Sequence, residues 1–189
     1  MAMLQLNKAA TLARMRRARS QLTPFGVDSP LPKKVRSYFY LGLLLTAAFV
    51  AQSLVAWHWP WLSDLQENES YKQLSGLALL TFIAHQWHFS VLRARGLQRK
   101  AGGLSHRHKW IGALAPLFFY LHSQQLGYGY QQLLSLAFFG IFLSGLCNPE
   151  ITRVHLAWFK PAWITVHVGL SVVLLSLAGY HIYIGFAYQ

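Results

Sequence analysis

Acidic residues and cysteine are scarce in this sequence, and each scarcity excludes a class of protein. There are five aspartates and glutamates against 17 lysines and arginines, and the one cysteine is Cys147. A single cysteine excludes an intramolecular disulfide and any cysteine-rich metal site. No glycine-rich nucleotide loop occurs. A chain that is 54% hydrophobic and 15% aromatic also lacks the composition of a water-soluble domain.

Long apolar runs are abundant instead. A membrane-crossing helix needs about 20 mostly apolar residues. Five such runs can be placed in the sequence, at 37–58, 73–92, 109–127, 130–147 and 162–187. They predict an all-α integral membrane protein, a five-span helical bundle in which residues 37–189 form one transmembrane domain. The spans leave no length for a flavin- or nicotinamide-binding domain.

Residues 1–36 form a basic segment ahead of the first predicted span. Leu4, Leu12 and Met15 lie among basic residues in its first half, which fits a helix lying in the cytoplasmic headgroup region. A disordered basic tail fits the same composition. The sequence leaves both interpretations open.

The basic residues are distributed unevenly over the predicted topology. With the N-terminus in the cytoplasm, 16 of the 17 lysines and arginines fall on the inner side, and only Lys72 falls outside. The positive-inside rule therefore predicts a cytoplasmic N-terminus and a C-terminus on the outer face. Basic residues beside spans also contact anionic lipid, so we expect membrane lipid as a partner and no nucleic acid.

Four histidines recur at one spacing in two of the spans. His108 and His122 are fourteen residues apart in the third span, and His167 and His181 are fourteen apart in the fifth. In an α-helix this interval turns through about 1400°, close to four full turns, and rises about 21 Å. Each pair therefore shares one helix face, with one histidine near each side of the membrane. Because both spans run outward, His108 can face His167 and His122 can face His181.

Facing imidazoles at one depth can bind both axial positions of a haem iron. A lone histidine in a membrane helix could equally be a hydrogen-bonded interior residue or a proton relay. The duplicated spacing favours the ligand interpretation. The sequence thus predicts two b-type haems between spans three and five, with His108, His122, His167 and His181 as iron ligands.

Three further histidines are candidates for a place beside these haems or for replacing a ligand: His85, His88 and His106. His85 and His88 share a face of the second span near its inner end. They fit a hydrogen bond to the inner haem or its ligands, a quinone or proton site, or polar residues that reach water at the interface. His106 has no partner at the fourteen-residue spacing, so we expect it to be interfacial.

The paired HX13H pattern resembles the ferric-reductase-like transmembrane domain superfamily of dihaem membrane cytochromes b. That superfamily includes the membrane part of NADPH oxidases and the haem-bearing subunit of the periplasmic methionine sulfoxide reductase system. The resemblance covers about residues 73–187. Many relatives have six spans, and reductase members carry nucleotide-binding domains. The spacing is also similar to cytochrome b of the quinol-oxidising bc complexes. The resemblance implies a bacterial inner membrane and electron flow outward from the cytoplasm.

No catalytic residue emerges, so we predict an electron-transfer subunit of oxidoreductase type. It would pass electrons across the membrane between a quinol or cytoplasmic flavin donor and an outer-side redox partner protein or ferric iron. One alternative is a haem-containing membrane anchor subunit of a larger respiratory complex. Another is a proton-conducting transporter subunit, which calls for Asp, Glu or Arg at mid-membrane, where these spans have none.

Overall fold

The computed structural model describes residues 33–154 and 156–187, and this part of the chain is helical throughout, without a strand. The eight described helices are α2 (Lys33–Val55), α3 (Pro60–Glu67), α4 (Glu69–Ala94), α5 (Gln98–Ala113), α6 (Ala115–His122), α7 (Tyr130–Leu146), α8 (Pro149–Thr152) and α9 (Phe159–Ala187). The predicted all-α class is confirmed. The predicted interfacial helix or tail at the N-terminus lies outside the described residues.

Two described helices are long and apolar enough to cross a membrane by length and composition. They are Ser37–Val55 within α2 and the whole of α9, and α7 is a shorter apolar helix. Membrane-spanning segments are therefore supported for the first and fifth predicted spans. The second, third and fourth spans coincide with α4, α5–α6 and α7, and their crossing of a membrane stays a prediction.

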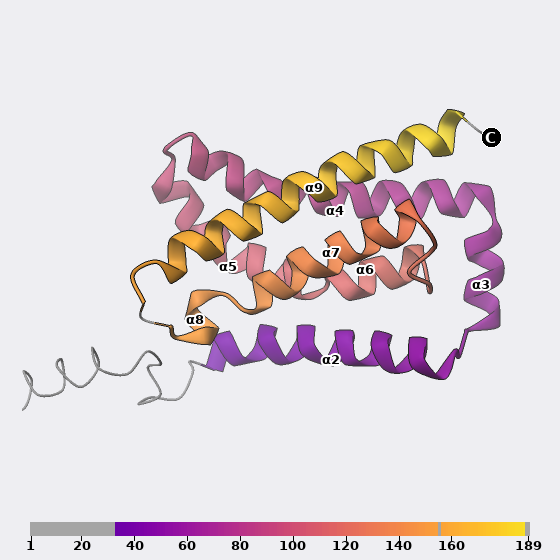
Figure 1. The fold of residues 1–189 in the computed structure, drawn as a ribbon, viewed down its shortest axis with the longest axis horizontal. Coiled ribbons are helices and arrows are strands. Elements are labelled where there is room, and N and C mark those ends of the chain that lie inside the picture. The colour runs from indigo at the N-terminus through magenta and orange to yellow at the C-terminus, as the bar shows by residue number, and fades with distance from the viewer. Residues whose placement is uncertain (1–32, 155, 188–189) are drawn as a thin grey trace, which may run out of the picture.

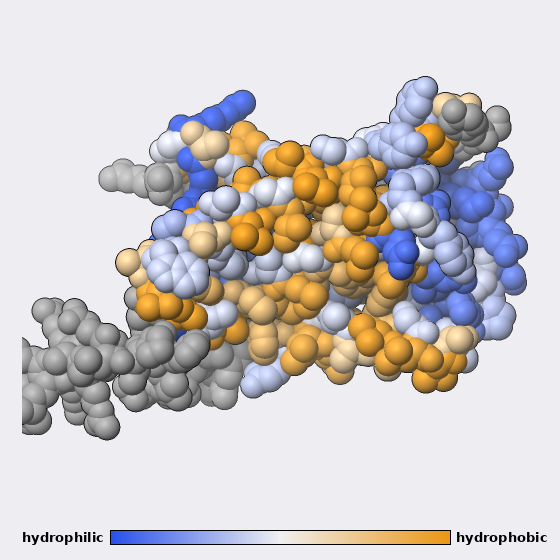
Figure 2. Space-filling model, viewed as in Figure 1, coloured by the Kyte–Doolittle hydropathy of each residue, from blue (hydrophilic) through white to orange (hydrophobic). Residues whose placement is uncertain are grey.

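The helices form an elongated bundle. In Figure 1, α2, α4, α7 and α9 run roughly along the long axis, while α3 crosses one end of the bundle. The α5–α6 pair contacts both α2 and α4, and α9 packs mainly on α7. Figure 2 shows apolar side chains over the middle of the molecule, with hydrophilic ones gathered at the α3 end and around the α4–α5 connection. A broad apolar surface between polar ends is what a lipid environment requires.

The third predicted span is broken in the structure. α5 ends at Ala113 and α6 begins at Ala115, and Pro116 stands in the first turn of α6. Proline has no backbone N–H and its ring crowds the preceding turn, which interrupts the helical ladder. Tight turns bridge the break, with Leu117 N–H donating to the Leu114 carbonyl at 3.0 Å. His108 and His122 consequently belong to two helices rather than one.

Aromatic packing fills the centre of the bundle. Phe49 and Phe119 are buried and meet edge to face at 5.5 Å between ring centroids, and Phe138 lies 5.3 Å from Phe119. These contacts join α2, α6 and α7. The core therefore fixes α6, and His122 with it, relative to the neighbouring helices.

Candidate functional site

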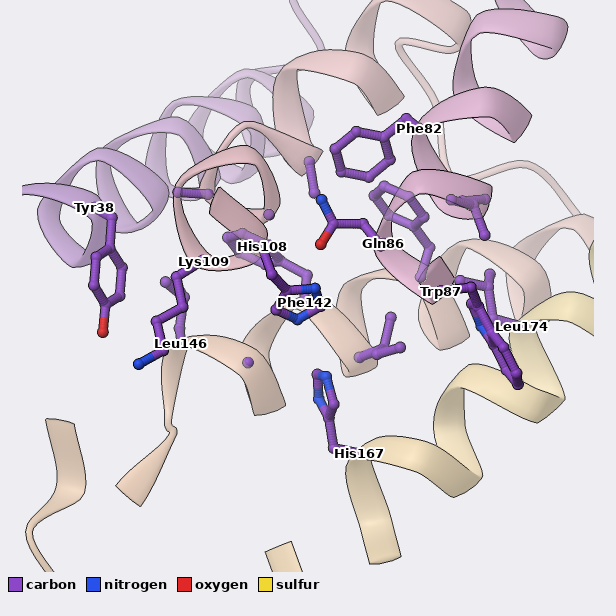
Figure 3. A pocket seen from close by; sticks show the side chains of 17 residues that line it. Tyr38, Phe82, Gln86, Trp87, His108, Lys109, Phe142, Leu146, His167 and Leu174 are labelled. Atoms are coloured by element: carbon purple, nitrogen blue, oxygen red, sulfur yellow. The ribbon is translucent and has the colours of Figure 1, made fainter. Parts of the chain in front are cut away.

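The inner histidine pair, at the end nearer the predicted cytoplasmic side, is His108 and His167. Their ring centroids are 6.3 Å apart and the ring planes are inclined by 80°. Figure 3 shows the two side chains pointing toward one another, His108 from α5 and His167 from α9. Both line a cavity of about 100 Å³, which we call the inner cavity.

The outer histidine pair is His122, the last residue of α6, and His181 of α9. Its centroids are again 6.3 Å apart, with the planes inclined by 86°. Both line a second cavity, of about 550 Å³, which we call the outer cavity. The break between α5 and α6 thus leaves both histidines facing α9, and the structure brings together the two pairs that the sequence predicts.

The common separation of 6.3 Å matches two ligands of one metal ion. An imidazole nitrogen binds a first-row metal at about 2.0–2.1 Å and the ring centroid lies roughly 1 Å further, so two opposed imidazoles stand about 6 Å apart. No group of three or more His, Cys, Asp or Glu that could hold a metal ion occurs among the described residues. The pairs therefore suit a metal that brings its remaining ligands with it.

Two of the four imidazoles have a serine at Nδ1. Ser144 Oγ on α7 lies 2.7 Å from His167 Nδ1, and Ser75 Oγ on α4 lies 3.0 Å from His122 Nδ1. A histidine that binds metal through one ring nitrogen commonly donates the hydrogen on its other nitrogen to such a partner. With Nδ1 occupied by serine, Nε2 is the remaining ring nitrogen of His122 and His167.

The other two imidazoles are held less closely at Nδ1. The Tyr130 hydroxyl is 3.5 Å from His181 Nδ1, at the limit of a hydrogen bond. His108 Nδ1 is buried without a partner of hydrogen-bond geometry, although the Gln86 main chain faces it. Gln86 Nε2, which is also buried without a partner, belongs to a residue that lines the same cavity. Each pair therefore has one firmly placed ring and one less constrained ring.

Aromatic rings support the inner pair. Trp163 stacks on His167 with centroids 5.3 Å apart and planes within 14°, and its Nε1 donates to the Ser144 carbonyl at 2.7 Å. On the other side, Phe89 stacks on His108 at 5.0 Å. Both rings of the inner pair thus have a flat aromatic neighbour, but only His167 also has a short hydrogen bond at Nδ1.

Hydrogen bonds around the end of α6 fix the outer pair. Gln66 Nε2 donates to the Tyr120 carbonyl at 2.8 Å, and the Tyr71 hydroxyl donates to the Leu121 carbonyl at 2.8 Å. Carbonyls in the last turn of a helix need such outside partners. Gln124 is buried just beyond the helix; its Oε1 accepts from Trp59 N–H at 3.0 Å. α3 and the start of α4 thereby hold His122 in place.

Each cavity is lined by one lysine among the described residues. Lys109 lines the inner cavity and forms an ion pair with Glu150 of α8. Lys72, the sole basic residue predicted to be outside, lines the outer cavity and is exposed. Ile83, Phe138 and Leu174 line both cavities and so form the wall between them. A negatively charged group in either cavity would find one cation nearby.

The three additional histidine candidates line neither cavity. His85 and His88 are exposed on α4 and line neither cavity, and His106 is exposed with its ring 6.3 Å from that of Trp110. Residues that sequence reasoning missed are Ser75, Ser144, Trp163 and Gln86. One signal could have found the two serines: the tetrapeptide LSGL occurs at 74–77 and again at 143–146.

Comparisons of the chain with protein-family models, with curated proteins and with solved structures give no match. The resemblance to ferric-reductase-like cytochromes therefore stays an expectation based on the four histidines.

Proposed function

We propose that this protein is a membrane-bound dihaem cytochrome b that passes single electrons across the membrane. One observation carries the proposal: two histidine pairs with the same 6.3 Å separation lie at two levels of one bundle. The two ligands on α9 are separated by fourteen residues, or about 21 Å of helix. Two redox groups at these depths would form a path from one side of a membrane to the other.

The lengths of the helices are compatible with five membrane spans, as the proposal requires. α4 has 26 residues and α5 with α6 covers Gln98–His122, each long enough to cross a bilayer core of about 30 Å at 1.5 Å per residue. α7 has 17 residues, the short end of the range. The basic inner segments would place the N-terminus in the cytoplasm and the C-terminus outside, in the inner membrane of a bacterium.

The histidines of both sites suit a haem, and the outer cavity of about 550 Å³ has room for one, whereas side chains around the inner cavity of about 100 Å³ would have to move. His108 and His167 would hold the inner iron, and His122 and His181 the outer one. Gly76 and Gly145 leave room beside the ligands, since a Cβ on either would stand 3.4 Å from a histidine Cε1. Lys72 and Lys109 would face the carboxylates of the bound groups. Haem supplies one-electron exchange when bound, and the protein sets its environment.

The chain's own residues would orient the ligands, exclude water and separate the two redox groups. Apolar side chains dominate the inner cavity, and the wall of Ile83, Phe138 and Leu174 keeps the two sites apart. The donor would be a quinol or a cytoplasmic flavin, and the acceptor an outer-side redox protein or ferric iron. This assignment rests on the resemblance and on the topology.

Haem content of the purified protein tests the proposal. The wild-type chain is expected to carry two b-type haems, and the double variant His167→Ala/His181→Ala none. The exposed pair His85→Ala/His88→Ala serves as the control and should keep both. A folded wild-type protein without haem, or a double ligand variant that keeps both, would refute the proposal.

A second measurement, on the protein with haem bound, tests electron transfer. Stopped-flow mixing with a quinol analogue or a reduced flavin should reduce both haems, and an outer-side oxidant should reoxidise them. Two haems that are neither reduced nor reoxidised would indicate a membrane anchor instead.

A further inference from the structure

The tetrapeptide LSGL occurs on two helices, and each copy touches one histidine of a different pair. Ser75 and Gly76 of α4 meet His122, and Ser144 and Gly145 of α7 meet His167. The contacts have the same form: Oγ of the serine lies at Nδ1, and the following glycine lies against Cε1. The two copies act at opposite ends of the bundle.

The glycine of each copy lies directly against the ring. A Cβ added at Gly76 would stand 3.4 Å from His122 Cε1, and one added at Gly145 would stand 3.4 Å from His167 Cε1. This distance is the short limit of an ordinary carbon contact, so no side chain larger than alanine fits there without a shift of the ring. The glycine therefore lets the helix approach the imidazole closely enough for the serine to reach Nδ1.

The direction of the hydrogen bond follows from the serine's other partner. Ser75 Oγ donates to the Lys72 carbonyl at 3.2 Å, and Ser144 Oγ donates to the Ile141 carbonyl at 2.7 Å. A hydroxyl has one hydrogen, so a serine that donates to its own helix can only accept from the imidazole. Nδ1 then carries the hydrogen, and Nε2 presents its lone pair to the metal position.

We propose that Ser75 and Ser144 are positioning residues that set the tautomer and the ring orientation of His122 and His167. Each acts together with the glycine that follows it. The inference rests on the proposed function, because it assigns these serines to the haem ligands. In each pair, the ring with the serine supplies the preorganised ligand, and the opposite ring, His181 or His108, adjusts to it.

Removing the serine has two physical consequences. Loss of a partner behind a metal-binding histidine lowers metal affinity by about 10–100-fold in comparable sites. Loss of the acceptor at Nδ1 also makes the imidazole a weaker electron donor, which disfavours ferric iron and raises the reduction potential of the haem concerned.

The variants Ser75→Ala and Ser144→Ala test the proposal in two preparations. In the haem-free protein, ¹⁵N NMR of labelled histidines should report the Nδ1–H tautomer for His122 and His167, and each variant should lose it at one ring only. In the haem-loaded protein, a redox titration should show one midpoint potential raised in Ser75→Ala and the other raised in Ser144→Ala. Haem affinity should fall about 10–100-fold at the same site.

Two hydroxyl residues provide matched controls. Thr81 on α4 and Ser176 on α9 are exposed and, like the two serines, donate to a carbonyl of their own helix. Thr81→Ala and Ser176→Ala should leave tautomers, potentials and haem affinity unchanged. Gly76→Ala and Gly145→Ala keep the hydroxyl and add a methyl group in contact with the ring, and each should retain the Nδ1–H tautomer.

The outcomes separate this inference from the proposed function. A wild-type protein that folds without haem defeats the proposed function. A wild-type protein with two haems, whose serine variants keep both tautomers and both potentials, overturns the positioning role alone. If a serine variant fails to fold, the haem-free wild-type protein decides: an Nε2–H tautomer at His122 or His167 overturns the role of the serine at that ring.

Discussion

The inner and outer histidine pairs share one geometry but differ in their surroundings. Both histidine pairs stand 6.3 Å apart, yet the inner cavity measures about 100 Å³ and the outer about 550 Å³. Stacked aromatic rings support the inner histidines, whereas hydrogen bonds at the end of α6 support His122. Helix periodicity determines the spacing of the histidines along each span. The packing of the neighbouring helices determines the volume of each cavity.

The two cavity volumes indicate that the outer site already has room for a large ligand and the inner site does not. Sites for organic ligands commonly enclose about 300–1,000 Å³, and only the outer cavity, at about 550 Å³, reaches that range. At the inner site, side chains around the cavity, Gln86 among them, would have to move for a macrocycle to enter. The comparison suggests two sites that bind the same group with unequal affinity.

The largest expected effect is the loss of a whole site. His167→Ala should remove the inner haem and His181→Ala the outer one, because a single remaining imidazole cannot hold iron from both sides. Each variant should retain one haem per chain, and the two retained haems should differ in midpoint potential. Redox titration with haem quantification is the measurement. Identical residual potentials in the two variants would contradict two distinct sites.

Breaking the network behind His122 should have the next largest effect. Gln124→Ala removes the acceptor of Trp59 N–H and the donor to Ser63 Oγ, which lie at 3.0 and 3.1 Å. Leaving buried polar groups without partners costs about 1–3 kcal/mol each, so we expect lower thermal stability and a weaker outer haem.

Thermal unfolding and haem retention measure the effect of Gln124→Ala. The variant Glu67→Gln at the end of α3, an exposed residue that lines neither cavity, is the control and should change stability by at most about 0.5 kcal/mol. Equal effects of both variants would exclude a specific role for Gln124.

The order in which haem binds the two sites tests whether cavity volume controls loading. Titration of haem-free protein with haem should fill the outer site first, since the outer cavity already has the room. His181→Ala should then abolish the tighter phase and His167→Ala the weaker one. A single phase that is unchanged in both variants would show that cavity volume does not control loading.

The pairing of the histidines could be predicted from sequence because the fourteen-residue spacing in both spans is close to four turns at 3.6 residues per turn. The break at Leu114 did not upset it, as α5 and α6 together still present His108 and His122 to α9. The positive-inside pattern singles out Lys72, which lines the cavity of His122 and His181, and the side of the membrane on which it lies stays a prediction.

The partners of those histidines could not be predicted in the same way. Ser75 and Ser144 come from α4 and α7, so their contacts depend on how neighbouring helices are rotated, which no spacing within one span reveals. The same rotation of α4 leaves His85 and His88 exposed while Gln86 and Trp87 line the inner cavity. The contacts between α3 and the end of α6 depend on how the segment between the first two predicted spans folds. Composition shows only that this segment is polar.

The smallest expected effect is electrostatic. Lys72→Gln removes the cation that, among the described residues, lines the outer cavity, which should lower the midpoint potential of the outer haem, because a nearby positive charge disfavours ferric iron. The shift will be modest and salt-dependent because Lys72 is exposed. Redox titration at low ionic strength measures it. Lys160→Gln, an exposed lysine away from both cavities, is the control, and equal shifts would remove Lys72 from the site.

Low-temperature EPR of the oxidised wild-type protein tests the central claim most directly. If each histidine pair binds one iron from both sides, the spectrum contains two low-spin ferric signals of similar intensity, one lost in His167→Ala and the other in His181→Ala. A folded protein with no low-spin ferric signal, or with only high-spin iron, would contradict the account.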